Sequence, residues 1–288
     1  MAFPNSKPNL LQSLSPLIKF FIPFLLLLQH QSVKSQQQPP SPMSAYETVG
    51  FDFSFFDKDD PNVLLIGNAS VSGGALRLTN TDQLGKPVPH SVGRVVHITP
   101  IHLWNKNNGH LADFTSDFSF VVNPKGSALR GDGFAFFLTS ANLNFLIPKN
   151  SSGGYLGLFK PETALDPSKN QIVAIEFDSF TNDWDPNSPN QSPHVGIDVD
   201  SIKSVATVPW PSELEPDNAV AHASLNYNSE DKRLSVFVGY PDNRNATVSA
   251  IVDLRNVLPE WISVGFSAST GDLVETHDIL NWSFEAAL

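Results

Sequence analysis

The chain of 288 residues contains no cysteine and carries a formal net charge of −11 at pH 7. The acidic balance excludes the basic surface that nucleic-acid binding requires, and the absence of cysteine means that disulfides cannot stabilise the fold. Hydrophobic residues make up 41% of the chain, so a large buried core must supply that stability instead.

Residues 1–35 have the features of a secretory signal peptide. Residues 20–28 form a short apolar run that follows Lys7 and Lys19, as such peptides require. A membrane anchor is the alternative, but the run is interrupted by a proline and is far shorter than the ~20 apolar residues of a spanning helix. We therefore expect cleavage, a flexible leader over residues 36–47, secretion to the extracellular space, apoplast or vacuole, and no membrane span.

Beyond residue 48, short apolar or alternating segments predict β-strands. They are rich in Val, Ile, Leu and Phe, and clusters of Gly, Pro, Asn and Asp separate them. These segments are 75–78, 118–122, 133–138, 172–177, 194–199, 234–238 and 261–266. Helical periodicity is absent apart from one turn expected at 253–257. Such a pattern is typical of an all-β, antiparallel β-sandwich, and the lack of an internal linker favours one domain over residues 48–288.

Polar motifs and tryptophans complete this picture. Five Asn-X-Ser/Thr sequons are present, at Asn68, Asn150, Asn190, Asn245 and Asn281. A proline follows the Asn190 sequon and Asn281 lies in an apolar segment, so the expected glycosylation sites are Asn68, Asn150 and Asn245. Three tryptophans are expected in the core rather than at a ligand site: Trp104, Trp261 and Trp282.

One acidic segment carries the chemistry. Glu176 and Asp178 are two residues apart in a predicted strand, so both point to one face. Asn182 and Asp185 follow in a loop, and His194 opens the next strand. Neighbouring carboxylates repel each other, and burying them uncompensated is costly. A bound divalent cation removes this conflict; oxygen ligands suit Ca²⁺, and an added imidazole suits a transition ion such as Mn²⁺. The alternative is an acidic surface loop with a solvated histidine.

The same segment resembles the metal-binding segment of the legume lectin family. The matching letters are IVAIEFDSF at 172–180, the WDP tripeptide that ends at 186, and HVGIDVDSI at 194–202. Further matching stretches occur in the family's order, at 92–104, 131–138, 153–159 and 265–284. The resemblance covers roughly residues 48–285 and implies a secreted, metal-dependent carbohydrate-binding protein with a jelly-roll sandwich.

The resemblance also implies which residues bind metal ions. A transition-metal site would come from Glu176, Asp178, Asp185 and His194, with Ser204 touching the ion through water. A calcium site would come from Asp178, the carbonyl of Phe180, Asn182 and Asp185. Two of these residues, Asp178 and Asp185, would bridge the ions.

The implied sugar pocket draws on several segments. Its residues would be Asp132, Gly154, Phe180, Asn182, Asp272 and Leu273. Asp132, expected after a cis peptide bond, would accept hydrogen bonds from sugar hydroxyls, and Phe180 would stack on the sugar ring. Gly154 and the loop of Asp272 and Leu273 would donate backbone N–H groups. The short loop favours mannose or glucose, and a galactose-type preference stays open.

Departures from the family pattern and two alternative functions accompany this interpretation. Gly131 stands where the family usually has alanine, and Asp272 adds a carboxylate to the specificity loop. A glycoside hydrolase is disfavoured, because Phe180 occupies the strand position where jelly-roll glucanases carry a third acid. A defence or storage protein without sugar binding is the other alternative on this fold. We also expect a homodimer or higher homo-oligomer, since antiparallel sandwiches leave sheet edges free.

Overall fold

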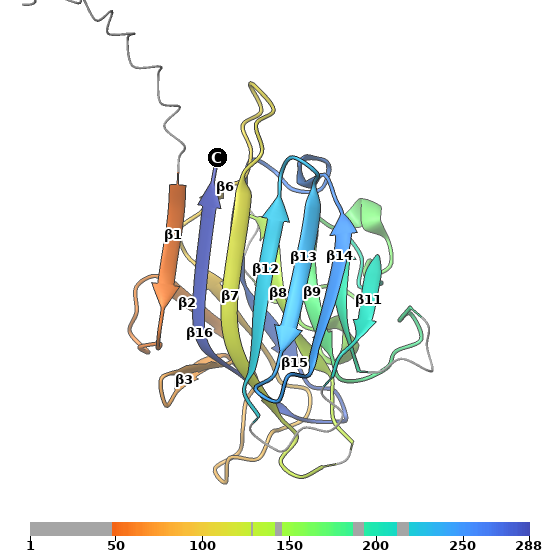
Figure 1. Cartoon of the computed structure of the whole chain (residues 1–288). Helices are drawn as coiled ribbons and strands as arrows, with labels where there is room; N and C mark the ends of the chain where they lie inside the picture. Colours follow the sequence, from red (N-terminus) through yellow and green to blue (C-terminus); the bar gives the residue numbers. More distant parts are fainter. Residues whose placement is uncertain (1–47, 128, 142–145, 187–192, 212–218) are drawn as a thin grey trace, which may run out of the picture. The chain divides into compact units, whose positions relative to one another are not determined.

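The structure, a computed structural model, describes residues 48–127, 129–141, 146–186, 193–211 and 219–288. They form two antiparallel sheets, one of which faces the viewer in Figure 1. The expected signal peptide (1–35), the leader (36–47) and the Asn190 sequon lie outside the described residues. Over those described ranges, no helix has the length and apolar character needed to cross a membrane.

The first sheet has the strand order β14-β13-β12-β7-β16-β4-β3, and β1 also pairs with β16. Its strands are β1 (Thr48–Phe53), β3 (Ser70–Ser72), β4 (Ala75–Arg77), β7 (Asp113–Asn123), β12 (Ala221–Asn228), β13 (Arg233–Gly239), β14 (Asn245–Ile251) and β16 (Thr276–Ala287). Along β7, residues alternate between buried and more exposed positions, as expected for a sheet with one face on the core and one toward solvent.

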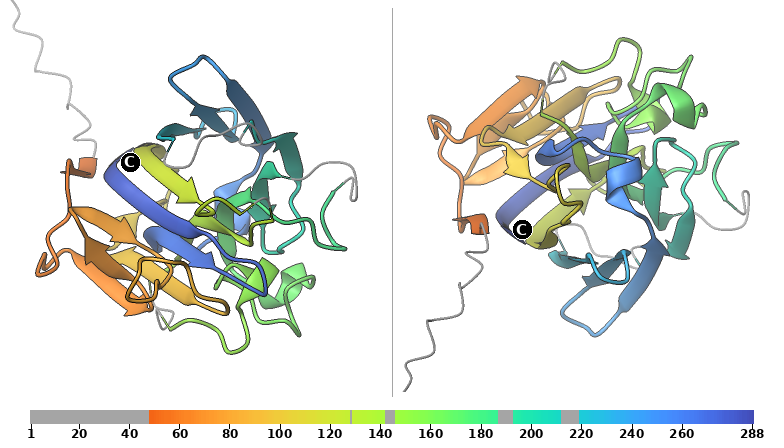
Figure 2. Two further views of the ribbon diagram at one scale, coloured as in Figure 1. Left: turned by 90° about the horizontal axis from the view of Figure 1, so that it is seen from below. Right: turned by 90° about the horizontal axis from the view of Figure 1, so that it is seen from above.

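The second sheet has the order β11-β10-β9-β8-β15-β5-β2, and β6 also pairs with β15. Its strands are β2 (Val63–Gly67), β5 (Val92–His97), β6 (Ile101–His102), β8 (Gly133–Ser140), β9 (Ile172–Asp178), β10 (His194–Val199), β11 (Ala206–Pro209) and β15 (Trp261–Ser269). Figure 2, which looks at the molecule from below and above, shows the two sheets as separate layers. Three short 3₁₀ turns complete the described elements: η2 (Gly153–Tyr155), η3 (Pro167–Lys169) and η4 (Leu254–Asn256).

Strand β8 is apolar on both faces because it lies between two cores. Phe134 and Phe136 are fully buried in the main core between the sheets. Ala135 and Phe137 face a smaller core on the other side of the second sheet. The segment that connects β8 to β9 covers this smaller core and contributes Leu158 to it. Loops therefore cover the outer face of the second sheet, which is not open to solvent.

The predicted strands and the turn are confirmed. Each predicted segment falls on β4, β7, β8, β9, β10, β13 or β15, with ends that differ by a few residues, and η4 occupies the expected turn. Trp282 is fully buried, and Trp104 is partly buried with its Nε1 3.0 Å from the Leu258 carbonyl. The core placement of Trp261 is wrong: it is 44% exposed and stacks on His102 at 4.3 Å between ring centroids. It occupies the first position of β15, which is the exposed end of an otherwise buried strand.

Replacing Trp282 with alanine should lower the free energy of unfolding by about 3–5 kcal/mol, as for other buried aromatic deletions. Its ring packs on Phe51 and Phe266, and Nε1 donates to Ser116 Oγ at 3.0 Å. The matched control Trp261→Ala removes a half-exposed indole and should cost less than about 1.5 kcal/mol. Urea unfolding with metal ions present measures both values, and equal losses would contradict this placement of the core.

Candidate functional site

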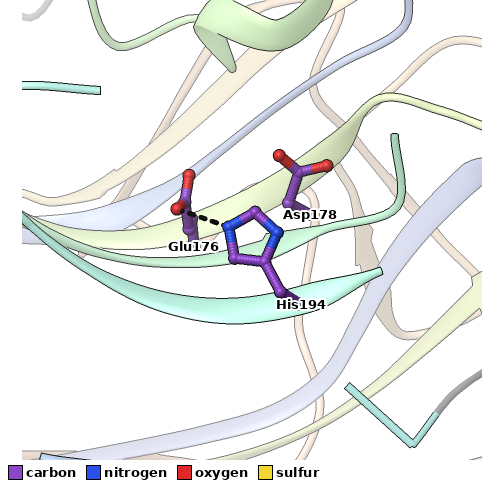
Figure 3. Close-up of side chains that lie close together, drawn as sticks. All are labelled: Glu176, Asp178 and His194. Carbon is purple, nitrogen blue, oxygen red and sulfur yellow. Dashed lines mark hydrogen bonds and ion pairs between the residues drawn. The ribbon is translucent and has the colours of Figure 1, made fainter. Parts of the chain in front are cut away.

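Strands β9 and β10 bring acidic side chains and an imidazole to one buried face. Phe177 lies in the main core, so its neighbours Glu176 and Asp178 point away from that core. His194 lies opposite Asp178 in the antiparallel ladder, and Gly196 lies opposite Glu176. Ligand atoms of Glu176, Asp178 and His194 lie within 4.8 Å of one another (Figure 3). These three residues could hold a metal ion.

Because Gly196 has no side chain, neighbouring polar groups fill the space beside it. A Cβ at this position would collide with Glu176 Oε1 and Ser204 Oγ. Glu176 Oε1 lies 2.9 Å from His194 Nε2 and also accepts a hydrogen bond from Ser204 Oγ. That hydroxyl lies 2.8 Å from Asp198 Oδ1. Asp198 is therefore a further buried carboxyl group of the cluster, and it was not predicted from the sequence. Its position two residues after Gly196 in β10, which places both on one face of the strand, was the available signal.

The loop after β9 is fastened to the carboxyl groups of the cluster. The backbone N–H of Phe180 donates to Asp178 Oδ1 at 2.6 Å, and that of Asn182 donates to Asp185 Oδ2 at 2.5 Å. Asp185 is 5% exposed, but it is not part of the group whose ligand atoms lie within 4.8 Å. A cation that binds Asp178 and Asp185 would therefore also fix the loop that carries Phe180 and Asn182.

The electrostatics of this cluster favour a bound cation. Burial, followed by the charge of Glu176, raises the pKa of Asp178 and of Asp198 well above the usual range. Burial also raises the pKa of Asp185 to about 6. Among the described residues, Asp185 Oδ1, Asp198 Oδ2 and His194 Nδ1 are buried without a hydrogen-bond partner. Oxygen-rich, mutually repelling donors with one imidazole fit a divalent metal ion, which would satisfy both charge and coordination.

A second group of expected residues surrounds Asp132, directly before β8. Asp132 follows a cis peptide bond from Gly131, as the resemblance implied. The side chain is 7% exposed, and its Oδ2 has no hydrogen-bond partner within the described part of the chain. A Cβ on Gly271 would lie 2.8 Å from that Oδ2, and a Cβ on Gly153 would lie 3.9 Å from it. Glycines thus border this carboxyl group, so no side chain from these positions fills the space beside it.

The loop after β9 lies beside Gly131 and Gly154, next to Asp132. A Cβ on Gly154 would overlap the side-chain amide of Asn182, so a side chain at this position would displace that amide. The Asn182 Oδ1 is buried and has no described hydrogen-bond partner. Phe180 is 38% exposed, and a Cβ on Gly131 would lie 3.2 Å from Phe180 Cβ and 3.5 Å from Leu273 Cβ. The structure therefore brings Asp132, Gly154, Phe180, Asn182 and Leu273 to one place.

The side chain of Asp272 behaves differently from its neighbours. It is 98% exposed, and its Oδ1 lies 3.4 Å from Nε2 of the exposed His90. Of the two orientations that the sequence left open, the side chain takes the one toward solvent. Any contribution of this residue to a ligand would therefore come from its backbone.

A buried pair near Asp132 was not singled out from the sequence. Glu275 and His277 are both fully buried, and Glu275 Oε1 lies 3.1 Å from His277 Nε2. Burial, followed by the charge of Glu275, raises the pKa of Asp132 to about 6, whereas the charge of His277 acts in the opposite direction. Alternation along β16 predicts that these two residues share a face, but their distance from Asp132 in the sequence gave no signal of proximity.

Comparison with known proteins agrees with this geometry. Residues 48–287 match the model of the legume lectin domain. Lectin 9 of Medicago truncatula is 62% identical over 95% of this chain and 99% of its own length. The mannose-specific lectin CML-2 of Centrolobium microchaete is 41% identical over 84% of this chain and 96% of its own. The metal-free form of lectin I-B4 from Griffonia simplicifolia superposes with a TM-score of 0.76, at 39% identity, over 83% of this chain and all of that one.

In protein stripped of metal ions, lowering the pH from about 7.5 to 5.5 should increase the free energy of unfolding. The pKa values of Asp178, Asp185 and Asp198 are raised by burial. The folded state therefore binds protons more tightly than the unfolded chain, and the resulting stability is lost as pH rises through the folded pKa values. Urea unfolding in EDTA measures this slope, and protein loaded with Ca²⁺ and Mn²⁺ should not show it.

The matched variant Asp198→Asn keeps the acceptor for Ser204 and removes the charge. It should flatten the slope of the metal-free protein and stabilise it at pH 7.5 by about 1 kcal/mol or more, because one pKa unit corresponds to ~1.4 kcal/mol. A slope that is the same with and without metal ions would show that these carboxyl groups do not repel one another.

Proposed function

The chain belongs to the legume lectin family, and from this premise we propose that it binds mannose- or glucose-type glycans in the pocket around Asp132, which bound metal ions hold in shape. Legume lectins are a non-catalytic family, so the chain is a carbohydrate-binding protein and not an enzyme. The observation that carries the proposal is the buried Asp132 Oδ2, which has no hydrogen-bond partner in the described part of the chain and is bordered by Gly153 and Gly271, while the adjacent Gly154 borders Asn182.

The pocket chemistry suits a neutral polyol. Asp132 Oδ2 and Asn182 Oδ1 are buried acceptors without described partners, and sugar hydroxyls can donate to both. Hydrogen bonds to a carboxylate are stronger than those between neutral groups. The bare backbone at Gly154 lets a sugar approach its N–H, and the half-exposed ring of Phe180 offers an apolar face to a pyranose.

The metal ions proposed for the cluster are calcium and manganese, or another transition ion at the second site. Legume lectins bind Ca²⁺ and a transition metal. The proposed calcium ligands are Asp178, the Phe180 carbonyl, Asn182 and Asp185. The proposed transition-metal ligands are Glu176, Asp178, Asp185 and His194, with Ser204 acting through water. When bound, the ions supply positive charge and fix the loop that carries the two sugar-facing residues Phe180 and Asn182; they supply no catalysis.

The choice of sugar class rests on two supports. The loop that contains Leu273 is short, as in mannose- and glucose-binding relatives. A relative at 41% identity carries a mannose-specific name. Galactose-type binding is the alternative within the family. A defence or storage protein without sugar binding is less well supported, since all the expected metal ligands are present in this chain.

We further propose that the protein is secreted, glycosylated and homo-oligomeric. The signal-peptide pattern of residues 1–35 supports export. Asn68, Asn150 and Asn245 are exposed, whereas Asn281 is only partly exposed and is therefore less suited to modification. Among the described strands, β1 pairs with β16 alone, so its outer edge is available for a second copy of the chain.

A glycan array probed with metal-loaded protein should show binding to mannose- or glucose-terminated glycans that is lost in EDTA. Asp132→Asn should weaken this binding about 10- to 150-fold, because a hydrogen bond to a charged group contributes ~1.5–3 kcal/mol. The matched control Asp272→Asn makes the same charge change on an exposed side chain and should stay within about twofold. Binding restricted to galactose would overturn the sugar class, and silence with metals supplied would favour the defence or storage alternative.

Gly154→Ala should weaken glycan binding at least about fivefold, because overpacking by one methyl group costs ~1–3 kcal/mol. The new Cβ would displace the Asn182 amide. Ser152→Ala is the matched control, since the Ser152 side chain makes no capping hydrogen bond to η2. Titration calorimetry with a methyl mannoside measures both, and a Gly154→Ala protein with native affinity would show that Asn182 does not border the sugar.

A further inference from the structure

A cavity of about 730 Å³ lies on the loop-covered outer face of the second sheet. Its lining contains none of the residues assigned to metal or sugar binding. Strands β5 and β8 contribute Arg94 and Thr139 to its wall, and the segment that connects β8 to β9 supplies most of the rest. This volume falls in the range of roughly 300–1,000 Å³ that is typical of small-molecule sites. The cavity is therefore large enough for an organic molecule and is separate from the proposed lectin pocket.

The charge of this cavity is opposite to that of the whole chain. Arg94, Lys149, Lys160 and Lys169 line it, and Glu162 is the one acidic side chain in its lining, although the net charge of the chain is −11. The three lysines are exposed, and none of them has an ion-pair partner among the residues that the structure describes. Four cationic side chains against one carboxylate in the lining attract an anion to the cavity.

Arg94 gives this positive charge a buried anchor. Its side chain is 6% exposed and lies over the Phe137 ring at 4.9 Å. Nη2 donates to the Gly157 carbonyl at 2.6 Å, while Nε has no hydrogen-bond partner in the described part of the chain. Burial lowers the pKa of Arg94 to about 10, so the guanidinium is still charged at neutral pH. A buried cation without a carboxylate is costly unless an anion compensates it.

Apolar side chains form part of the remaining wall, beside the polar residues Thr139, Asn150, Asn170 and Gln171. Leu158 and Ile172 are each 6% exposed and border the cavity together with Ile147 and Pro148. A small inorganic anion would leave these surfaces in contact with water, and an apolar molecule without charge would leave the cations uncompensated. The lining therefore fits a ligand that has both an acidic group and an apolar body.

We propose that this cavity is a binding site for a small amphipathic organic anion of the aryl carboxylate class. Its carboxylate lies toward Arg94 and the lysines, and its ring packs on Leu158 and Ile172. A planar carboxylate matches the guanidinium geometry. The site needs neither the metal cluster nor the pocket around Asp132, so it stands independently of the lectin function.

The probe for this site is 2-naphthoate, with 2-naphthalenemethanol as a neutral molecule of the same ring system. Titration of the metal-loaded protein should give saturable binding of one naphthoate per chain. Its affinity should exceed that of the alcohol by about tenfold or more, since hydrogen bonds to charged groups are the stronger kind, and it should fall with added salt. Equal affinity for the acid and the alcohol, or no saturable binding of the acid, would overturn the proposal.

Charge variants locate the binding within the chain. Lys160→Gln/Lys169→Gln should weaken naphthoate binding about three- to tenfold, because one exposed ion pair changes affinity by up to about fivefold. Glu162→Gln removes the one acidic lining residue and should strengthen binding about twofold, by the same magnitude of effect. The matched control is Lys58→Gln/Lys125→Gln, which removes two exposed lysines that do not line the cavity.

All these positions are exposed, so the variants should fold, and circular dichroism together with glycan binding checks that they do. Naphthoate affinities that are identical in the cavity variant and the control variant would mean that the probe binds elsewhere, which overturns the site. A loss in the cavity variant and a gain in Glu162→Gln, with glycan binding unchanged, would establish it.

Discussion

Buried negative charge is the constraint on which the rest of this structure depends. The β9–β10 ladder gathers Glu176, Asp178 and Asp198 on one buried face, where His194 is the basic side chain that ion-pairs with the cluster among the described residues. Burial and the mutual repulsion of these groups disfavour their charged forms, which raises the pKa of the two aspartates. The proposed divalent cation would resolve the conflict, and because Asp178 also accepts a hydrogen bond from the Phe180 amide, it would also fix the loop that carries Phe180.

The sandwich converts this local charge balance into a defined pocket. Gly133, the first residue of β8, lies opposite Asp178 in the ladder between β8 and β9. The Ser179 backbone N–H also donates to the Asp132 carbonyl at 2.8 Å. Backbone hydrogen bonds therefore fix the position of the Asp132 segment, proposed to bind sugar, relative to the acidic segment proposed to bind metal ions. Phe134 and Phe177 stack on each other in the main core with ring centroids 4.6 Å apart, which gives both segments a rigid support.

Local patterns in the sequence account for the fold class and the acidic cluster. Period-two spacing places Glu176 and Asp178 on one face, and the same rule would have found Asp198 two positions beyond Gly196. Proximity between distant segments is different, because no local rule brings Asp132 or Glu275 to its neighbours; that information came only from the resemblance or from the structure. Whether a residue at the end of a strand is buried could not be predicted from the sequence either. Trp261 has the composition of a core residue, but its position at the first residue of β15 leaves it partly exposed.

The strand order also has a consequence for how the protein is made. The last two described strands, β15 and β16, are not edge strands: β15 lies between β8 and β5, and β16 lies between β7 and β4. Until β15 and β16 have been synthesised, each sheet therefore has a gap inside it, and the strands that flank the gap have unpaired backbone groups. Such long-range pairings form slowly, and transiently exposed strand edges promote aggregation. The order of synthesis therefore leaves inner strand edges of both sheets exposed until β15 and β16 pair with them.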